Sequence, residues 1–274
     1  MNKIPMIIMA AGVSSRMKNS VSSSKITSDL INQSNTRVKG FIEVGNRKEP
    51  FIYYIISNCI KADIRDFYII LSNNSKEFQK YLRNLEKKLS ININFAFQDF
   101  YGREKPLGTS DAIFQTMNQY EELKNNRFLV CNCDNLYSTK AIKLLVNESR
   151  YNSLIAYEYQ CLEFSQDRLS SFSILNIEND FLLKIIEKPS LEIIQNHKIK
   201  KYVSMNLFSF IGEQVYPYFK DCPISSERGE KEIPNALQNM ISNNKDAIIT
   251  FPLCEHVPDI TYKDDISVIN SFLD

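Results

Sequence analysis

Small residues and one arginine follow the first apolar run of this chain, in a pattern that could hold phosphate. The run covers residues 4–9, and Ala10, Ala11 and Gly12 come next, with Arg16 shortly after them. Small residues at the carboxyl end of a buried strand let backbone amides reach a ligand, and an arginine adds two parallel donors for phosphate oxygens. The G-x-G-x-x-G spacing of dinucleotide-binding loops is missing, which excludes an NAD-dependent enzyme. A purely structural turn is the alternative.

A carboxylate follows a second apolar run. Residues 129–133 read LVCNC, and Asp134 comes directly after them. Because the carboxyl ends of parallel strands form the usual ligand edge of an open α/β sheet, we expect Asp134 to face a ligand. Its hard oxygen atoms suit Mg²⁺, which we predict as the cofactor. The alternative is a loop aspartate that caps the helix expected from Thr139.

The elements that must position these residues alternate between strand-like and helix-like stretches. Apolar runs and period-two patterns predict strands at 4–9, 67–71, 91–97, 128–133, 154–159, 172–177, 182–186, 202–210 and 247–251. Helical periodicity predicts helices at 50–60, 76–88, 109–117, 139–146, 214–219, 234–241 and 263–272. Residues 109–111 are expected to cap the third helix, and the strands within 154–186 to form an antiparallel meander with a tight turn at 178–180.

The predicted fold is a single α/β domain over residues 1–274, with a Rossmann-like, three-layer α/β/α mixed sheet. Residues 1–150 form the half that would bind a nucleotide. Residues 151–274 add an antiparallel subregion that supplies another wall of the pocket. Residues 19–35 are rich in Ser, Asn and Thr without apolar periodicity, which predicts a mobile loop inserted into the first half.

The composition is that of a globular protein without a general affinity for nucleic acid. Lysine and arginine number 33, aspartate and glutamate 32, and the formal net charge is +1. A chain without excess positive charge is a poor candidate for binding DNA through its phosphates. Its apolar runs are shorter than the roughly 18 residues of a membrane span, so we expect no membrane partner.

The cysteines and the first residues indicate a location inside the cell. Six cysteines are present, and only Cys131 and Cys133 lie close together in sequence. This C-x-C spacing lacks the second pair that a zinc site would need. We therefore expect buried thiols in a reducing cytoplasm. The apolar run at 4–11 has no cleavage pattern after it, so a signal peptide is not expected.

Further motifs follow in order along the chain, and together they resemble the sugar-phosphate nucleotidylyltransferases. They are KGF at 39–41, PFI at 50–52, GREKPLGTSDA at 102–112, CDN at 133–135, EKP at 187–189, SMNL at 204–207 and TYKDD at 261–265. With the loop at 9–17, they cover essentially the whole chain. The resemblance implies the nucleotide-diphospho-sugar transferase fold. It also implies transfer of a nucleoside monophosphate from an NTP to a phosphorylated acceptor, for which we take a sugar 1-phosphate, with release of pyrophosphate.

The resemblance assigns roles to residues of the first half. Arg16 and Lys39 would act on the triphosphate and on the charge of the transition state. Residues that would bind the nucleotide are Ala10, Ala11, Gly12, Gln98, Gly108 and Thr109. Among them, Gln98 can both donate to and accept from a base, and Gly108 admits the ring against the backbone.

The second half would bind the acceptor. Glu187 would bind an acceptor hydroxyl and Lys188 its phosphate. Asn206 is polar within an expected strand, where it would be costly if buried without a partner, so we expect it to contact the acceptor. The resemblance also implies a second metal ligand beside Asp134, and Asp259 is the candidate.

The implied reaction needs no general base, because a phosphate monoester is mostly dianionic at pH 7, with a second pKa of about 6. The sequence agrees, since its two histidines, His197 and His256, belong to no arrangement of nucleophile and base. What the reaction requires is stabilisation of phosphate charge by magnesium and cationic side chains.

Two alternatives stay open. Ser15 stands where the family usually has Gly-Thr or Gly-Ser, which allows a cytidylyltransferase acting on a non-sugar phosphate or phosphonate such as phosphocholine. The other is a non-catalytic, sugar-nucleotide-binding regulatory subunit, although such a protein need not keep a metal carboxylate like Asp134. The residues define neither the nucleobase nor the acceptor, and they leave a homo-oligomer open.

Overall fold

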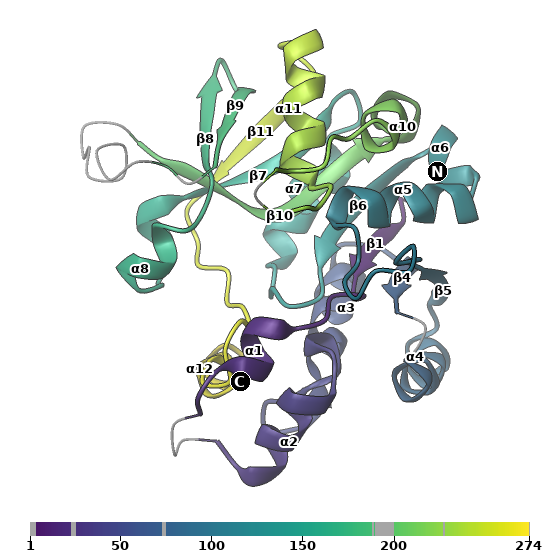
Figure 1. Ribbon diagram of the computed structural model, residues 1–274, viewed down its shortest axis with the longest axis vertical. Coiled ribbons are helices and arrows are strands. Elements are labelled where there is room, and N and C mark those ends of the chain that lie inside the picture. Colours follow the sequence, from purple (N-terminus) through teal and green to yellow (C-terminus); the bar gives the residue numbers. More distant parts are fainter. Residues whose placement is uncertain are drawn as a thin grey trace.

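A nine-stranded sheet runs through the computed structural model, which describes residues 4–22, 26–72, 75–187, 189, 200–226 and 228–273 (Figure 1). The strand order is β5-β4-β1-β6-β10-β7-β11-β9-β8. Consecutive numbers are rarely neighbours in this order, so most connections cross over a face of the sheet. Such crossovers are typical of α/β folds, in which helices make the connections.

The first half of the chain builds the parallel part of the sheet. Its strands are β1 (Met6–Met9), β4 (Asp66–Leu71), β5 (Asn92–Phe97) and β6 (Arg127–Asn132). Neighbouring strands among these four are all parallel, so their carboxyl ends share one edge of the sheet. The four strands predicted here are confirmed, with ends that differ by one or two residues.

The second half builds the other part of the same sheet. Its strands are β7 (Asn152–Glu158), β8 (Ile174–Glu178), β9 (Phe181–Ile186), β10 (Tyr202–Ile211) and β11 (Ile248–Leu253). Strand β10 is antiparallel to β6 and β7, and β11 is parallel to β7. The meander predicted for β7, β8 and β9 is wrong, because the late strand β11 lies between β7 and β9. The tight turn is confirmed: β8 and β9 form a hairpin in which Asn179 and Asp180 have positive φ.

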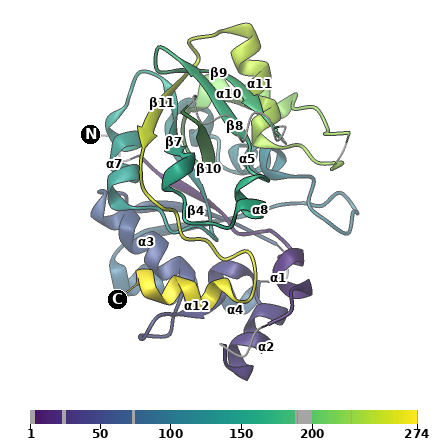
Figure 2. The same ribbon diagram turned by 90° about the vertical axis from the view of Figure 1, so that its left-hand side faces the viewer.

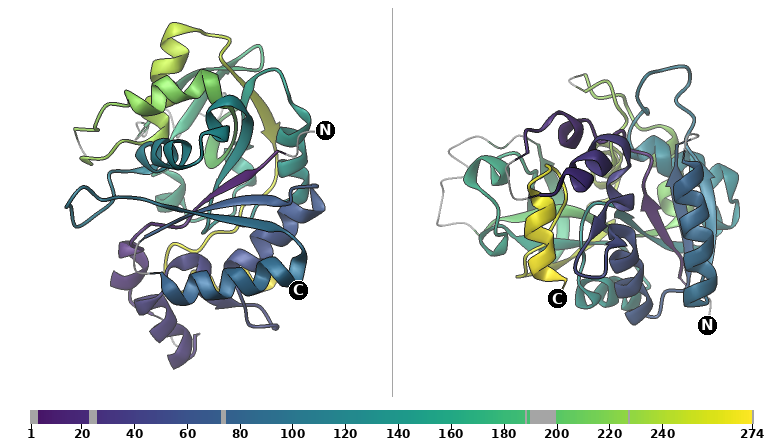
Figure 3. Two further views of the ribbon diagram at one scale, coloured as in Figure 1. Left: turned by 90° about the vertical axis from the view of Figure 1, so that its right-hand side faces the viewer. Right: turned by 90° about the horizontal axis from the view of Figure 1, so that it is seen from below.

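Helices cover both faces of this sheet (Figure 3). One face carries α3 (Phe51–Lys61), α4 (Lys76–Leu89), α7 (Thr139–Asn147) and α12 (Asp265–Ile269). The other carries α5 (Thr109–Gln119), α6 (Glu122–Asn125), α10 (Gly212–Lys220) and α11 (Ile233–Asn243). Alternate residues of β1 enter the two cores, Met6 and Ile8 one and Ile7 the other. The three-layer α/β/α class is therefore confirmed.

Two helix starts show how local sequence sets the elements. Pro50 is the N-cap residue of α3, where its missing N–H is no loss, and the helix buries a face spaced at three and four residues. Helix α5 begins at Thr109 as predicted, but its N-cap residue is Gly108, and no side chain caps it. The predicted cap by residues 109–111 is therefore wrong.

The segment predicted as a mobile loop, residues 19–35, is folded in its described parts. It contains the end of α1 (Ser15–Asn19) and most of α2 (Ser28–Thr36), and Gln33 and Ser34 on α2 are buried. The polar side chains that argued for a loop are satisfied within the helix, because Ser34 Oγ donates to the carbonyl of Leu30 at 2.6 Å. Polar composition therefore did not prevent folding here.

The end of the chain returns to this segment. After β11 the chain runs in extended form to α12, which lies near α1 (Figure 2). Lys263 is buried there, and its Nζ donates to the carbonyl of Ser20 at 2.7 Å and to that of Lys18 at 3.0 Å. Short elements complete the described chain: η1 (Lys39–Phe41), β2 (Glu43–Val44), β3 (Glu49–Pro50), η2 (Tyr159–Cys161), α8 (Gln166–Leu169) and η3 (Asn270–Phe272).

The cysteines divide into two groups. Cys161 and Cys254 form a disulfide, which corrects the prediction of six buried thiols. The other four, Cys59, Cys131, Cys133 and Cys222, are buried and free as predicted. The spacing of 93 residues between the bonded pair gave no sequence signal for the bond. None of the helices in the described ranges has the length and apolar character to cross a membrane.

Candidate active site

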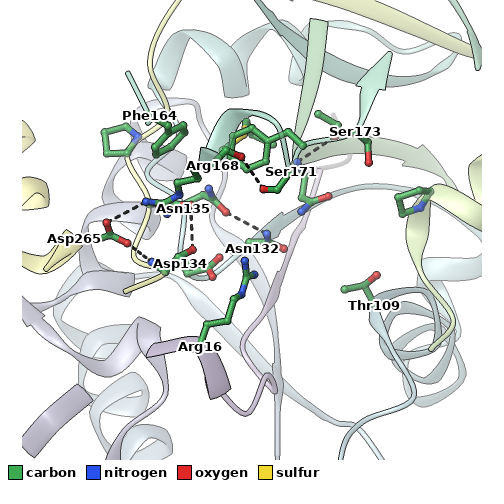
Figure 4. A pocket seen from close by; sticks show the side chains of 18 of the residues that line it. Arg16, Thr109, Asn132, Asp134, Asn135, Phe164, Arg168, Ser171, Ser173 and Asp265 are labelled. Carbon is green, nitrogen blue, oxygen red and sulfur yellow. Dashed lines mark hydrogen bonds and ion pairs between the residues drawn. The ribbon is translucent and has the colours of Figure 1, made fainter. Parts of the chain in front are cut away.

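Two adjoining cavities lie at the edge of the sheet where the parallel strands end. The smaller, of about 380 Å³, is lined by the first loop and the loop before α5, and the larger, of about 770 Å³, by residues of the second half. Four residues line both: Arg16, Thr109, Asn132 and Asp134. In Figure 4, Arg16 points from α1 toward the end of β6, where Asn132 and Asp134 lie.

Most of the first loop lines the smaller cavity, including Ala11 and Gly12, but Ala10, which was predicted to bind the nucleotide, lies in the hydrophobic core and does not line the cavity. Ala10 and Ala11 are buried after β1, whereas Gly12 faces open space, since a Cβ added there would meet no atom within 4 Å. Ser14 has a φ of 57°, in the left-handed region, and turns the chain into α1. This turn sets Arg16 at the boundary of the two cavities, exposed and without a hydrogen bond or ion pair to any described residue.

Lys39 and Asp134 meet, although 95 residues separate them. Lys39 Nζ donates to Asp134 Oδ2 at 2.8 Å, and the lysine is only 8% exposed. Gly40 allows the approach, because its Cα packs on Cys133, where an added Cβ would lie 3.3 Å from the Cys133 Cβ. The structure thus brings together a cation and a carboxylate that the sequence predicted to act on the same phosphates.

The predicted base-reading residues also meet. Gln98 is buried at the end of β5, and its Nε2 donates to the carbonyl of Gly108 at 3.0 Å. Gly108 has a φ of 119°, and a Cβ there would lie 2.3 Å from the Lys231 carbonyl, so this position requires glycine. Thr109 Oγ1 accepts a hydrogen bond from the Ile233 amide at 3.1 Å. This bond connects the loop that precedes α5 to the start of α11.

The predicted acceptor residues reach the larger cavity where the structure describes them. Glu187 and Asn206 line it, while Lys188 lies outside the described residues. Asn206 interrupts β10 with a φ of 59°, at a register shift between Ser204 and Phe208. Asparagine tolerates this left-handed backbone, and the irregular strand turns the residue toward the cavity.

Asp259 lies beside Asp134, on a neighbouring stretch of extended chain. An isolated antiparallel bridge joins Asn135 and Asp259, and the Ile260 amide donates to the carbonyl of Asp134 at 2.9 Å. The carboxylate of Asp259 nevertheless pairs with the guanidinium of Arg168, from α8. Asp259 therefore serves as an ion-pair partner in this structure, and its role as a metal ligand stays a prediction.

Arg168 was not among the predicted residues, yet its ion pairs connect separate segments of the acceptor wall, by which we mean the residues of the second half that line the larger cavity. It bonds to Asp259 and also to Asp265 Oδ1 at 3.0 Å, and its guanidinium lies 4.5 Å from the ring centroid of Phe164 (Figure 4). The other Asp265 oxygen accepts from the amides of Thr261 and Tyr262, each at 2.7 Å. The TYKDD motif thus fixes an ion-pair network through a residue almost a hundred positions earlier.

Burial shifts the acidity of groups around the site. Desolvation raises the pKa of Asp259 to about 6, an effect that the Arg168 charge only partly offsets. Burial also raises the pKa of the Cys133 thiol to about 12, and the neighbouring carboxylate of Asp134 adds to this. Cys133 therefore stays a neutral thiol at pH 7 in the protein without metal.

The oxygen atoms at the end of β6 fit a magnesium ion. Asp134 Oδ1 takes part in no hydrogen bond among the described residues, because Lys39 binds the other oxygen. Asn132, the last residue of β6, donates through Nδ2 to Asn135 Oδ1 at 3.1 Å. Its side-chain oxygen, Oδ1, is not used in this hydrogen bond. A carboxylate and an amide oxygen are hard donors of the kind that Mg²⁺ binds, usually together with phosphate oxygens and water.

One cluster of three side chains with metal-ligand chemistry occurs in the described ranges, and it lies elsewhere. It consists of Glu158, Cys161 and Cys254. Both sulfurs of this cluster are joined in the disulfide, so they offer no thiolate to a metal.

Several residues of the site were not predicted from the sequence, and for two of them the sequence pattern could have indicated a role. Asn132 and Asn135 flank Asp134 and could have been included with it, since polar residues at a strand end share that residue's position. Asp265 belongs to the TYKDD motif, but the motif did not reveal its ion pair with Arg168. Arg168 and Glu232 carried no local signal, because their contacts depend on long-range packing. Glu232 is 9% exposed, lines the larger cavity and leaves Oε2 without a hydrogen-bond partner.

Comparison with known proteins agrees with this geometry. A family model described as nucleotidyl transferase matches residues 28–255. The glucose-1-phosphate adenylyltransferase of Hydrogenovibrio crunogenus is 21% identical over 278 residues, which cover 97% of this chain and 60% of that protein. The bifunctional protein GlmU of Methanococcus maripaludis is 25% identical over 213 residues, 77% of this chain and 43% of that protein. The chain thus spans about half the length of these curated relatives.

A solved structure has the same fold. The structure of UDP-glucose pyrophosphorylase complexed with UDP-glucose aligns with a TM-score of 0.71, covers 98% of each chain and is 14% identical in sequence. At this identity the likeness supports the fold and says nothing further about substrates.

Proposed function

We propose a reaction for this chain, which belongs to the nucleotidyl transferase family: it transfers a nucleoside monophosphate from an NTP to a sugar 1-phosphate. The products are pyrophosphate and an NDP-sugar, and Mg²⁺ is the proposed cofactor. The curated relatives named above, a glucose-1-phosphate adenylyltransferase among them, support this class of substrate.

The observation that carries the proposal is the junction of the two cavities. Arg16, Asn132 and Asp134 line both, so a nucleotide in the smaller cavity and an acceptor in the larger would meet at these side chains. Transfer of a nucleotidyl group requires such a meeting of two phosphates, with cationic groups and hard oxygen ligands beside them. A binding protein for one sugar nucleotide would not need a carboxylate at the junction.

The side chains at the junction have distinct tasks. In the proposed reaction, an oxygen of the sugar phosphate attacks the α-phosphorus, and the bond to the β-phosphate oxygen breaks. Arg16 reduces the repulsion between the two anions, and Lys39 orients the Asp134 carboxylate through their ion pair. Asp134 and Asn132 would hold Mg²⁺, which when bound supplies charge neutralisation on the phosphates.

No side chain needs to remove a proton, because the attacking phosphate is already dianionic. The described surroundings agree with this, since the one described histidine, His256, packs between Phe164 and Phe272. Desolvation lowers the pKa of His256, so it is neutral at pH 7. We assign it a packing role.

A pyrophosphate-release assay tests the proposal. Each NTP is combined with a panel of sugar 1-phosphates, with phosphocholine and a phosphonate as non-sugar acceptors, at saturating Mg²⁺. We expect release only with an NTP and a sugar 1-phosphate together. Release with the non-sugar acceptors alone would favour the cytidylyltransferase alternative. Binding of sugar nucleotides without release from any pair would favour a regulatory subunit.

A further inference from the structure

Asp111 is a buried carboxylate that the proposed reaction does not use. It lies in the first turn of α5 and is 2% exposed. A buried carboxylate is costly unless hydrogen bonds or a cation compensate for its lost hydration. No ion pair to Asp111 occurs among the described residues, so its hydrogen bonds and the start of the helix must compensate. One of those hydrogen bonds comes from Gln98, which lines the smaller cavity.

Three donors bind the Asp111 carboxylate. Its Oδ2 accepts from Gln98 Nε2 at 3.2 Å and from Gln115 Nε2 at 2.7 Å, and its Oδ1 accepts from Tyr101 Oη at 3.4 Å. Gln115 is itself fixed in orientation, because its Oε1 accepts from the Asp99 amide at 2.7 Å. Gln115 therefore fixes the position of the Asp111 carboxylate, and the carboxylate in turn accepts a hydrogen bond from Gln98.

The Gln98 amide can adopt only one orientation in this network. Its Nε2 faces the carbonyl of Gly108 and the carboxylate of Asp111, and both of these groups can only accept. Reversing the amide would set Oε1 against two acceptors, one of them charged. Both Nε2 hydrogens are used in this way, so Oε1 is the polar atom that Gln98 can offer to a ligand in the smaller cavity, which it lines.

We propose that Asp111 is a positioning residue that fixes Gln98 as a hydrogen-bond acceptor, and thereby selects nucleobases with a hydrogen on the ring nitrogen of their pairing edge. Uracil and thymine at N3 and guanine at N1 satisfy Oε1 with a donor. Cytosine N3 and adenine N1 are acceptors and would oppose an Oε1 that faces the ring nitrogen, because the donors of these two bases lie on their exocyclic amino groups. The inference rests on the proposed function in one respect, that the base of an NTP lies in the smaller cavity.

The experiment measures base discrimination instead of activity alone. The ratio of kcat/KM for UTP to that for CTP is determined for the wild type and for Asp111→Ala. Hydrogen bonds to charged groups are strong enough that we expect the ratio to fall about tenfold or more in Asp111→Ala. An unchanged ratio in a folded Asp111→Ala variant would overturn the proposal, as would a wild type that prefers CTP or ATP.

Two further variants separate positioning from a general structural role. Asp111→Asn keeps an oxygen for Gln98, because the fixed donor of Gln115 orients the new amide, so it should retain the wild-type ratio. Tyr101→Phe removes only the contact to Oδ1 and should also retain it. A drop in either variant equal to that of Asp111→Ala would show that Asp111 supports the loop without setting the polarity of Gln98.

Equilibrium binding makes the outcome independent of turnover. Titration calorimetry with UTP and with CTP reports the same discrimination in a protein that transfers nothing. Loss of discrimination in Asp111→Ala without any pyrophosphate release would support the polarity of Gln98 and contradict the proposed reaction. Release with retained discrimination in Asp111→Ala would do the reverse. If Asp111→Ala fails to fold, Asp111→Leu, which removes the carboxylate but keeps a side chain of similar size, should lower the ratio in the same direction, and an unchanged ratio there would overturn the proposal.

Discussion

The two walls of the site are built in different ways. The nucleotide wall, which lines the smaller cavity, is built mainly on the ends of parallel strands, and most of its residues lie within loops that are short in sequence, such as 10–16 and 98–109. Lys39 is the exception, since it reaches Asp134 across 95 residues. The acceptor wall is assembled from distant segments: Arg168 reaches Asp259 across 91 residues, and Cys161 reaches Cys254 across 93. A wall of the first kind is determined by strand topology, whereas one of the second kind depends on bonds that join separate parts of the chain.

This difference leads to different expectations for substitutions. Changes on the nucleotide wall should alter chemistry or base selection without loosening the fold, because strand packing positions the residues there. Changes on the acceptor wall should alter stability and acceptor binding together, because the same ion pairs and disulfide serve both. The predictions below test this contrast, beginning with the largest effect.

Asp134→Asn should lower turnover about a hundred- to a thousandfold, because one charge at the junction of the cavities is lost and charge stabilisation of this kind has that magnitude. The measurement is kcat at saturating NTP, acceptor and Mg²⁺. Asp66→Asn at the start of β4, far from the junction, is the control with the same change of charge and should be as active as the wild type. Near-normal turnover of Asp134→Asn at limiting Mg²⁺ would remove Asp134 from the metal site.

The contrast between the walls also explains what the sequence could predict. Strands β1, β4 and β6 were predicted from apolar runs and β5 from its alternation of apolar and polar residues, and their shared edge follows from parallel pairing. Asp134 and Lys39 were predicted separately, and only folding brings them to 2.8 Å. The position of β11 between β7 and β9 could not be predicted, because nothing local distinguishes it from a continued meander.

The same reasoning explains the wrong prediction for residues 19–35 and the missed role of Arg168. The polar segment 19–35 was misinterpreted because composition does not reveal that Lys263, from the far end of the chain, binds the carbonyls of Lys18 and Ser20. Arg168 looks like any surface arginine until α8 packs beside the TYKDD motif. Local patterns therefore predict elements and strand-end residues, and they do not predict partners that only tertiary contacts supply.

Opening the disulfide should destabilise the acceptor wall selectively. Bonds that close long loops usually contribute about 2–4 kcal/mol, so the free energy of unfolding of Cys161→Ser should fall by that amount. The KM for the sugar phosphate should rise, while that for the NTP should stay the same. Chemical denaturation with and without a reductant gives the measurement. Cys161→Ser itself should not respond to the reductant, and a wild type indifferent to reduction would contradict the role given to the bond.

Asp259 should make stability depend on pH. Burial raises its pKa from 3.8 to about 6, so the folded state holds the proton more tightly than the unfolded state. The stabilisation from this group is fully present below pH 4 and is lost as the pH rises through 6, a change of about 3 kcal/mol for two pKa units. The difference in unfolding free energy between the wild type and Asp259→Asn should therefore fall by that amount between pH 3.5 and pH 7. A constant difference over this range would mean that Arg168 keeps the carboxylate ionised throughout.

The smallest expected effects divide the two substrates between the walls. Arg16→Ala should raise the KM for the NTP about ten- to a hundredfold, and Lys188→Ala should do so for the acceptor, because a charge-assisted bond to phosphate contributes about 1.5–3 kcal/mol. The assignment of Lys188 comes from the EKP motif at 187–189. Arg16 lines both cavities, so its variant should also lower kcat, whereas Lys188→Ala should leave kcat near the wild-type value. Steady-state kinetics with each substrate varied in turn measures all four changes. Equal increases in KM for both substrates in both variants would show that the two walls do not bind separate substrates. The contrast between the walls would then apply only to the contacts that build them.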